Sequence, residues 1–180
     1  MLDLTSKILP NTVKVGGRVF LVNTDFRAWM KFEIEVSRIR KNVEQELDVS
    51  YLFPGEAPDY FDVNDLFVFS RPQSILPRQI TYREVIVLDY ELDADLIYAA
   101  FMEQYGIDLV EVDELHWHKF LALMKGLNGS TTLAKVMSYR GYEKTDSKKD
   151  PYEELRRAWE IPYLSEDEQE GLDEFSNLFK

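Results

Sequence analysis

The chain has no cysteine and only two histidines among its 180 residues. Without cysteine it has no disulfide framework, no thiol nucleophile and no thiolate ligand for a metal, and it suits a reducing compartment. A structural zinc site needs four nitrogen or sulfur ligands, which two histidines cannot supply. We therefore predict that the protein has no metal site.

Long apolar runs are also missing. The densest one, near residues 85–88, is far shorter than the roughly 20 residues that cross a bilayer. The first residues, MLDLTSKILPNTVKVGG, lack the basic start, apolar stretch and cleavage site of a signal peptide. We therefore expect no membrane partner.

Basic residues are scarce relative to acidic ones, because 21 lysines and arginines face 33 aspartates and glutamates, which gives a net charge of −12. This balance argues against nucleic acid as a partner, since phosphates require a basic surface. An acidic surface fits solubility, a basic protein partner or imitation of a nucleic acid, and ordinary acidity without special meaning is the simplest interpretation.

Catalytic motifs are absent as well: the chain contains no G-x-S-x-G, no P-loop and no G-x-G-x-x-G. Asp89, Asp93 and Asp95 cluster, but Asp93 and Asp95 diverge on a helix, and Asp89 is more simply a helix cap. The cluster also lacks the glycine that a calcium loop needs. We predict a protein that is not an enzyme, with no catalytic residue and no cofactor.

Hydrophobic periodicity is what the sequence has in abundance. The segment VKVGGRVFLV (residues 13–22) predicts a β-hairpin around Gly16-Gly17. Spacings of three and four then predict helices over residues 24–47, 59–70, 89–106, 113–125 and 130–140, although a strand is an alternative for the end of the second. The predicted fold is mainly α, a compact, helix-dominated α+β domain of about five to seven helices with an N-terminal hairpin.

Helix starts and stops are predicted from capping residues. Thr24, Asp89 and Asp113 are expected to cap their helices, and Ser130 or Thr131 the last of the five. Gly106, Gly126 and Gly141 are expected to end three of these helices.

Both histidines fall in one segment, DELHWHKFLALMKGLNGS, residues 113–130. Trp117, Phe120 and Met124 recur there at helical spacing, with Trp117 toward the core. Positions two apart on a helix point to nearly opposite sides, so His116 and His118 are expected to diverge. We predict that one histidine packs near the aromatic face and the other lies on the surface.

Composition divides the chain after Tyr142. Residues 1–142 are predicted to form a single globular domain, and residues 143–180 an acidic C-terminal extension with one or two short helices. Asp150 and Pro151 suit the start of the first helix, and Ser165 with Glu168 has capping-box spacing. The last segment carries an apolar stripe of Leu172, Phe175, Leu178 and Phe179. This extension packs at the domain edge, stays free or folds on a partner.

Large aromatic side chains are the best candidates for contact with a partner, since tryptophan is enriched at interface hot spots. The candidate partner-binding residues are Trp29, Trp117, Trp159, Phe175 and Phe179. The alternative for Trp29 and Trp117 is a core position, which their apolar helical stripes favour.

A longer pattern resembles a known family. It reads D-x-x-x-I-Y-A-A-F-x-x-x-Y-G-I-D-L followed by L-H-W-x-K-F-x-A-L-x-x-G-L, and here covers Asp93 to Leu109 and Leu115 to Leu127. With DFR (residues 25–27) and YRGY (139–142), it is similar to the bacteriophage gene-product-fifteen family of siphophages and prophages of Gram-positive bacteria, over roughly residues 10–145. The family commonly has an aromatic residue where this chain has His118, which favours a variable position over a ligand.

The resemblance implies a function that composition alone does not. Genes of this family typically lie between those for the major tail protein and the tape-measure protein, where tail assembly chaperones are encoded. The resemblance implies a non-enzymatic chaperone that binds the tape-measure protein and recruits major tail (tube) subunits in the bacterial host cytoplasm, and that is absent from the mature virion. Self-association into a homo-oligomer stays open.

Two other functions compete with this one. The first is an acidic phage-encoded inhibitor, either a DNA mimic or a binder of a host protein. Its acidic residues are mixed with lysine and arginine up to about residue 160, which is unlike a row of phosphates. The second is a metal-dependent hydrolase, which needs a converging cluster of carboxylates and histidines that the sequence does not indicate.

Overall fold

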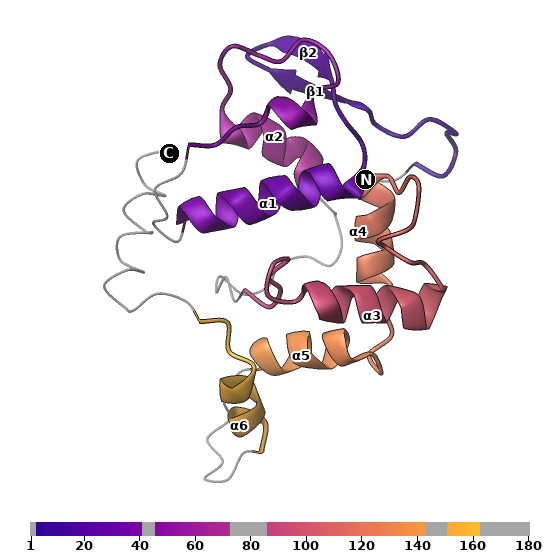
Figure 1. The fold of residues 1–180 in the computed structure, drawn as a ribbon, viewed down its shortest axis with the longest axis vertical. Helices are drawn as coiled ribbons and strands as arrows, with labels where there is room; N and C mark the ends of the chain where they lie inside the picture. The colour runs from indigo at the N-terminus through magenta and orange to yellow at the C-terminus, as the bar shows by residue number, and fades with distance from the viewer. Residues whose placement is uncertain (1–2, 41–45, 73–85, 143–150, 163–180) are drawn as a thin grey trace.

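The computed structural model describes residues 3–40, 46–72, 86–142 and 151–162, and its architecture is a helical domain topped by a two-stranded hairpin (Figure 1). The predicted helix-dominated α+β fold is confirmed. The described elements are β1 (Thr12–Val15), β2 (Arg18–Leu21), α1 (Phe26–Arg40), the 3₁₀ turn η1 (Ser50–Leu52), α2 (Val63–Ser70), α3 (Ala94–Tyr105), α4 (Trp117–Lys125), α5 (Thr132–Arg140) and α6 (Pro151–Ala158).

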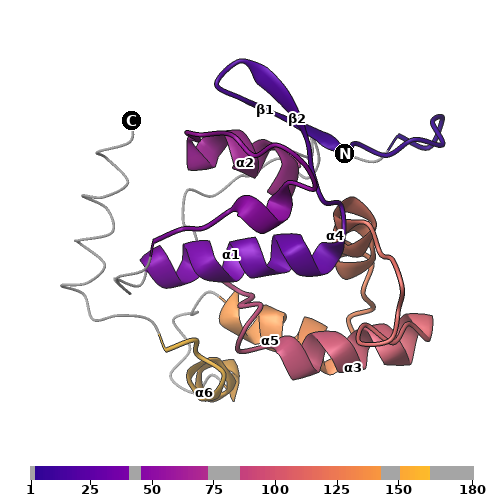
Figure 2. The ribbon, with the colours of Figure 1, turned by 45° about the horizontal axis from the view of Figure 1, so that its top comes forward.

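The hairpin forms where the Gly-Gly pair predicted it. β1 and β2 pair antiparallel, with Val15 opposite Arg18. Gly16 and Gly17 have φ angles of 55° and 87°, which a two-residue hairpin turn requires and which residues with a Cβ rarely adopt. The buried side chains of β1 face α2, on which the hairpin rests in Figure 2.

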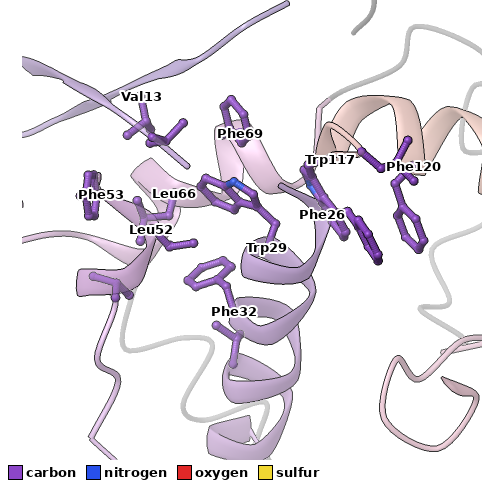
Figure 3. Packing of buried hydrophobic residues seen from close by; sticks show 14 of the residues in the cluster. Val13, Phe26, Trp29, Phe32, Leu52, Phe53, Leu66, Phe69, Trp117 and Phe120 are labelled. Carbon is purple, nitrogen blue, oxygen red and sulfur yellow. The ribbon is translucent and has the colours of Figure 1, made fainter. Parts of the chain in front are cut away.

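The core is built around α1, whose buried stripe follows the predicted spacing. Phe26, Trp29, Phe32 and Val36 are buried along one face of the helix. In Figure 3 this stripe lies between the side chains of α2 and η1 and those of α4. Trp29 stacks on Phe69 of α2 with ring centroids 4.5 Å apart. Aromatic burial of this kind supplies much of the apolar area that stabilises a domain of this size.

The start of α1 differs from the prediction by one residue. The carboxylate of Asp25, not the side chain of Thr24, caps the helix by accepting the backbone N–H of Arg27 at 2.9 Å. The backbone of Thr24 has another role, because its carbonyl accepts the N–H of Trp117 at 2.7 Å. The first turn of α1 is thereby tied to the first turn of α4.

The start of α3 also differs. α3 begins at Ala94, and Asp89 instead caps the preceding turn, where it accepts the backbone N–H groups of Glu91 and Leu92. Leu92 therefore precedes the helix, although it falls within the predicted helical range 89–106, and it is 53% exposed. The end of α3 is as predicted, with Gly106 in the left-handed conformation at φ 63°.

The later helices match their predicted boundaries more closely. Thr131 caps α5 by accepting the N–H of Ala134, and α6 begins at Pro151. Tyr152 of α6 stacks on Tyr142 with centroids 5.2 Å apart, so α6 packs beside α5. The division of the chain after residue 142 stays a prediction. The expected cap Asp150 and the helix expected from Ser165 lie outside the described residues.

Membrane insertion finds no support in the described helices, since none of them is both long enough and apolar enough to span a bilayer.

Candidate functional site

The two histidines lie closer together than the sequence predicted. Asp113 was expected to cap α4, but His116 is the N-cap: its Nδ1 accepts the backbone N–H of His118 at 3.0 Å. Because His116 precedes the helix, the 100° step between helical side chains does not apply to it. The two rings lie 5.2 Å apart between centroids, so the expected divergence is wrong.

Each histidine ring binds a backbone carbonyl from a distant segment. Nε2 of His116 lies 2.8 Å from the carbonyl oxygen of Pro10, and Nε2 of His118 lies 2.8 Å from that of Phe69. A carbonyl only accepts, so Nε2 is the protonated nitrogen in both rings. In the described parts of the chain, no group of three or more histidines and carboxylates is arranged to hold a metal. The histidines connect the N-terminal segment and α2 to α4.

Burial lowers the pKa of both histidines below the usual value, and desolvation of the charged form is the main cause. For His118 the geometry agrees, because its buried Nδ1 has no hydrogen-bond partner among the described residues. A second proton would be placed on that nitrogen. Both rings are therefore neutral structural groups near pH 7.

An ion pair between Asp93 and Arg140 is buried at the junction of α3 and α5. The guanidinium binds the carboxylate at two points, 2.6 and 2.9 Å, and both side chains are less than a tenth exposed. Such a two-point pair compensates the cost of burying two charges only when the remaining polar groups are also satisfied.

The remaining donors and acceptors of this pair are used. Arg140 also donates to the carbonyls of Trp159 and Val87, and Asp93 accepts the backbone N–H of Asp89. One ion pair thus joins α5, the start of α3, the chain before it and the chain after α6. Asp93, which belonged to the acidic cluster in the sequence, has its charge fully engaged and is not a free acid or base. The buried role of Arg140 was not predicted.

The tryptophans proposed as partner anchors differ in accessibility. Trp29 and Trp117 are 0% and 1% exposed, which agrees with the alternative that placed them in the core. Trp117 also donates its indole N–H to the carbonyl of Ser70 at 2.8 Å. Trp159 is 38% exposed just beyond α6 and remains accessible. Phe175 and Phe179 lie outside the described residues.

A candidate partner surface lies on the face of α1 opposite its buried stripe. It is an open hollow of about 330 Å³, which we call the α1 groove; its lining is Arg27, Met30, Lys31, Ile34, Glu35 and Arg38. These positions recur at three- and four-residue spacing, so they form one continuous stripe of the helix. Met30 and Ile34 supply an apolar floor, and charged side chains surround it.

Three cations lie on the rim of the α1 groove, and each is paired with a carboxylate: Arg27 with Asp25, Lys31 with Glu35 and Arg38 with Glu91. The side chains of Arg27, Lys31 and Arg38 are 41%, 57% and 42% exposed. The rim is therefore balanced in charge, and exposed ion pairs of this kind contribute little to stability.

Interactions at the two ends hold the rim of the α1 groove in place. Arg27 donates to the carbonyls of Leu109 and Val112, and Arg38 pairs with Glu91. The groove is therefore anchored at each end to the chain that flanks α3. We did not predict this groove; the sequence signal that could have indicated it is that Arg27, Lys31 and Arg38 fall on one face of the predicted helix.

Comparison with protein families gives one match: the family described as "Bacteriophage Gp15 protein" matches residues 4–163. The chain belongs to the bacteriophage Gp15 family. Comparisons with curated proteins and with solved structures found no match. The family match extends beyond the 10–145 region of resemblance on both sides and includes α6.

The motif by which we recognised the Gp15 family describes folding determinants. Asp93 and Arg140 form the buried ion pair, His116 caps α4, and Trp117 and Phe120 fill the core. Only Arg27, from the DFR element, also lines the α1 groove. These motif positions therefore account for how the protein folds, while the α1 groove lies largely outside them.

Proposed function

We propose that this Gp15-family protein is a non-enzymatic tail morphogenesis protein, a tail assembly chaperone that binds the tape-measure protein and helps recruit tail-tube subunits. The match to a phage family over residues 4–163 is the observation that carries the proposal. The chaperone role itself comes from the place that such genes usually occupy.

The α1 groove supports the proposal because its shape suits a helical partner. Along α1, the stripe from Arg27 to Arg38 spans about 16 Å, or three helical turns. Met30 and Ile34 can receive the apolar side chains that a tape-measure helix exposes before the tube encloses it. An open hollow with a charged rim favours modest, reversible binding, which a chaperone that is later replaced requires.

The absence of enzymatic activity is part of the proposal. The carboxylate best placed for acid–base chemistry, Asp93, is held in a two-point ion pair, and both histidines are bonded to backbone carbonyls. A group committed in this way is not available to transfer protons. We further propose that the protein acts in the host cytoplasm and is absent from the virion. A homo-oligomer, if one forms, would serve the same chaperone function.

The alternative, an acidic inhibitor that mimics DNA or binds a host protein, receives less support. A DNA mimic presents a continuous row of carboxylates, whereas around the α1 groove the carboxylates alternate with three cations that pair with them.

Co-expression with the tape-measure protein of the same phage or prophage tests the proposal. We expect the tape-measure protein, insoluble when expressed alone, to become soluble in a complex that carries many copies of this chain, as measured by affinity capture and light scattering. An insoluble tape-measure protein with no captured chain would contradict the chaperone role and leave the family assignment intact.

A further inference from the structure

One side of β2 carries backbone groups that the hairpin itself does not use. Val22 donates its N–H to the carbonyl of Asn11 at 2.9 Å, and in an antiparallel pair such bonded positions alternate along the strand. The N–H and C=O groups of Val19 and Leu21 therefore point away from β1. In the part of the chain that the structure describes, neither N–H has a hydrogen-bond partner. This stretch, which we call the β2 edge, can bind another strand through its backbone.

The two edges of the hairpin differ in their side chains. Val19 and Leu21 of β2 are apolar and are 67% and 60% exposed. Their cross-strand partners in β1 are Lys14 and Thr12, which are polar and also exposed. A lysine is one of the residues by which proteins keep an edge strand from pairing. The outward-pointing positions of β2 carry no charge, so β2 is the edge suited to a second strand.

The β2 edge is short and has defined ends. At one end the backbone of Asn23 is occupied, since its N–H bonds to the carbonyl of Leu52 and its carbonyl accepts the indole N–H of Trp29. At the other end the chain leaves the strand in the turn at Gly16 and Gly17. A long extended segment would run past Asn23 into η1. A strand that itself turns away after four residues, as β2 does, would not.

A second copy of β2 therefore fits the β2 edge. Two β2 strands related by a two-fold axis at Phe20 run antiparallel, with Val19 of each copy opposite Leu21 of the other. Both residues point their backbone groups at the partner, so each of these pairs exchanges both of its N–H···O bonds. Gly17 of one copy then lies opposite Asn23 of the other, and each chain turns away where its partner's edge is closed. We propose that β2 pairs in this way with β2 of a second copy, which joins two hairpins into one sheet.

The side chains of this sheet also match across the two-fold axis. On the exposed face, a row across the sheet reads Lys14, Val19, Leu21 and Thr12, the last two from the second copy. The aliphatic side chains meet in the centre as directly opposite pairs, which is the contact that stabilises a sheet. The lysines of the two copies stay on the outer strands, at least about 14 Å apart, which exceeds the screening length of about 8 Å in physiological salt.

The dimer contact is small. Two strands of four residues bury far less than the roughly 1,000 Å² of a stable interface, so we expect a dimer that forms only at high protein concentration. Copies gathered on one partner protein reach such concentrations locally. In Figures 1 and 2 the hairpin lies at one end of the domain, away from α3 and α5, where a second copy can approach. The inference is tested without the tape-measure protein, so its failure would leave the proposed function standing.

Cross-linking between full chains tests the pairing, and the absence of cysteine leaves no other thiol. Chains with Val19→Cys are mixed with chains that carry Leu21→Cys. The matched control mixes Val68→Cys, from an exposed position on α2, with Leu21→Cys. A third mixture, Thr12→Cys with Lys14→Cys, reports pairing through β1. A short bis-maleimide is used because opposite Cβ atoms lie about 5 Å apart, which is more than a disulfide spans.

We expect the 19–21 mixture to cross-link between chains at least about tenfold faster than the 68–21 mixture, because pairing raises the effective concentration of the two thiols. Equal rates for all three mixtures, or a faster 12–14 mixture, would overturn the inference.

Proline at the β2 edge gives a second, independent test. Val19→Pro removes an N–H that β1 does not use, and edge strands accept proline. In sedimentation, the mass of the unsubstituted chain should rise with concentration above the 21.2 kDa of one chain, while Val19→Pro stays at that mass. A constant mass for the unsubstituted chain, or an equal rise in the variant, would contradict pairing through β2. If Val19→Pro impairs folding, as judged by thermal unfolding, Val19→Lys takes its place.

Discussion

At the scale of single residues, the stability of this fold depends on its buried ion pair more than on its exposed ones. Asp93 and Arg140 bury opposite charges in contact with each other, and their remaining groups bind the backbone of two segments, one before α3 and one after α6. Exposed pairs such as Arg18 with Glu56, at 67% and 74% side-chain exposure, stay hydrated and need no counter-ion to be stable. The two kinds of pair differ in how much stability depends on them.

Replacement of Arg140 by methionine tests this difference. Arg140→Met leaves the Asp93 carboxylate buried without its counter-ion, which should lower the free energy of unfolding by about 3–5 kcal/mol in urea titrations. The matched control Arg18→Met removes an exposed partner and should cost less than about 1 kcal/mol. A loss for Arg140→Met no larger than that of the control would show that the buried pair does not hold the α3–α5 junction.

The histidines predict a pH dependence. Their folded pKa values lie below the usual value, so the unfolded chain takes up more protons as the solution becomes acidic. Their contribution is present above the unfolded pKa of about 6.5 and is lost as pH falls below it. The thermal midpoint should therefore fall between about pH 7.5 and about pH 5.5.

A variant that keeps the helix cap and the bond to Phe69 without titrating isolates this effect, although it loses the bond from His116 to the carbonyl of Pro10. His116→Asn retains a good N-cap, and His118→Gln retains a donor for the carbonyl of Phe69. In the double variant the midpoint should change much less over the same pH range. An unchanged slope would assign the acid sensitivity to the carboxylates instead.

At the scale of elements, the ends of helices explain where prediction from sequence succeeded. Gly106 and Thr131 each determine a helix end by local conformation or a local hydrogen bond; Gly106 was predicted, and Thr131 was one of the two caps predicted for α5. The caps at Asp25 and His116 were missed by one and three residues, because tertiary bonds between the starts of α1 and α4 set those boundaries. Local rules do not contain such contacts.

Gly106 offers a test of a helix end that depends on backbone conformation alone. A Cβ added there meets nothing within 4 Å, so the φ of 63° is the only cost of Gly106→Ala. The substitution should lower the free energy of unfolding by about 1 kcal/mol in urea. Gly129→Ala is the control, since Gly129 has the same free space without a positive φ, and it should be neutral or slightly stabilising. Equal effects would contradict the assigned role of Gly106.

At the scale of the whole molecule, the sequence predicted the fold class and the family, but it did not predict the α1 groove. The buried stripe of α1 was predicted from hydrophobic periodicity, and Trp29 and Trp117 lie in the core as the alternative held. The α1 groove was not predicted, because its hollow depends on how Arg27 and Arg38 are held by the chain flanking α3. Contacts between distant segments cannot be inferred from the periodicity of one helix.

The central claim is that the α1 groove receives the tape-measure protein, and capture of this protein by substituted chains tests it most directly. Ile34→Glu places a charge on the apolar floor, whereas Val68→Glu places one at a position that is already 75% exposed on α2. We predict that Ile34→Glu reduces capture by about tenfold or more, a loss of ~1.4 kcal/mol, while Val68→Glu and the unsubstituted chain capture equally. Equal capture by all three folded chains would contradict the account.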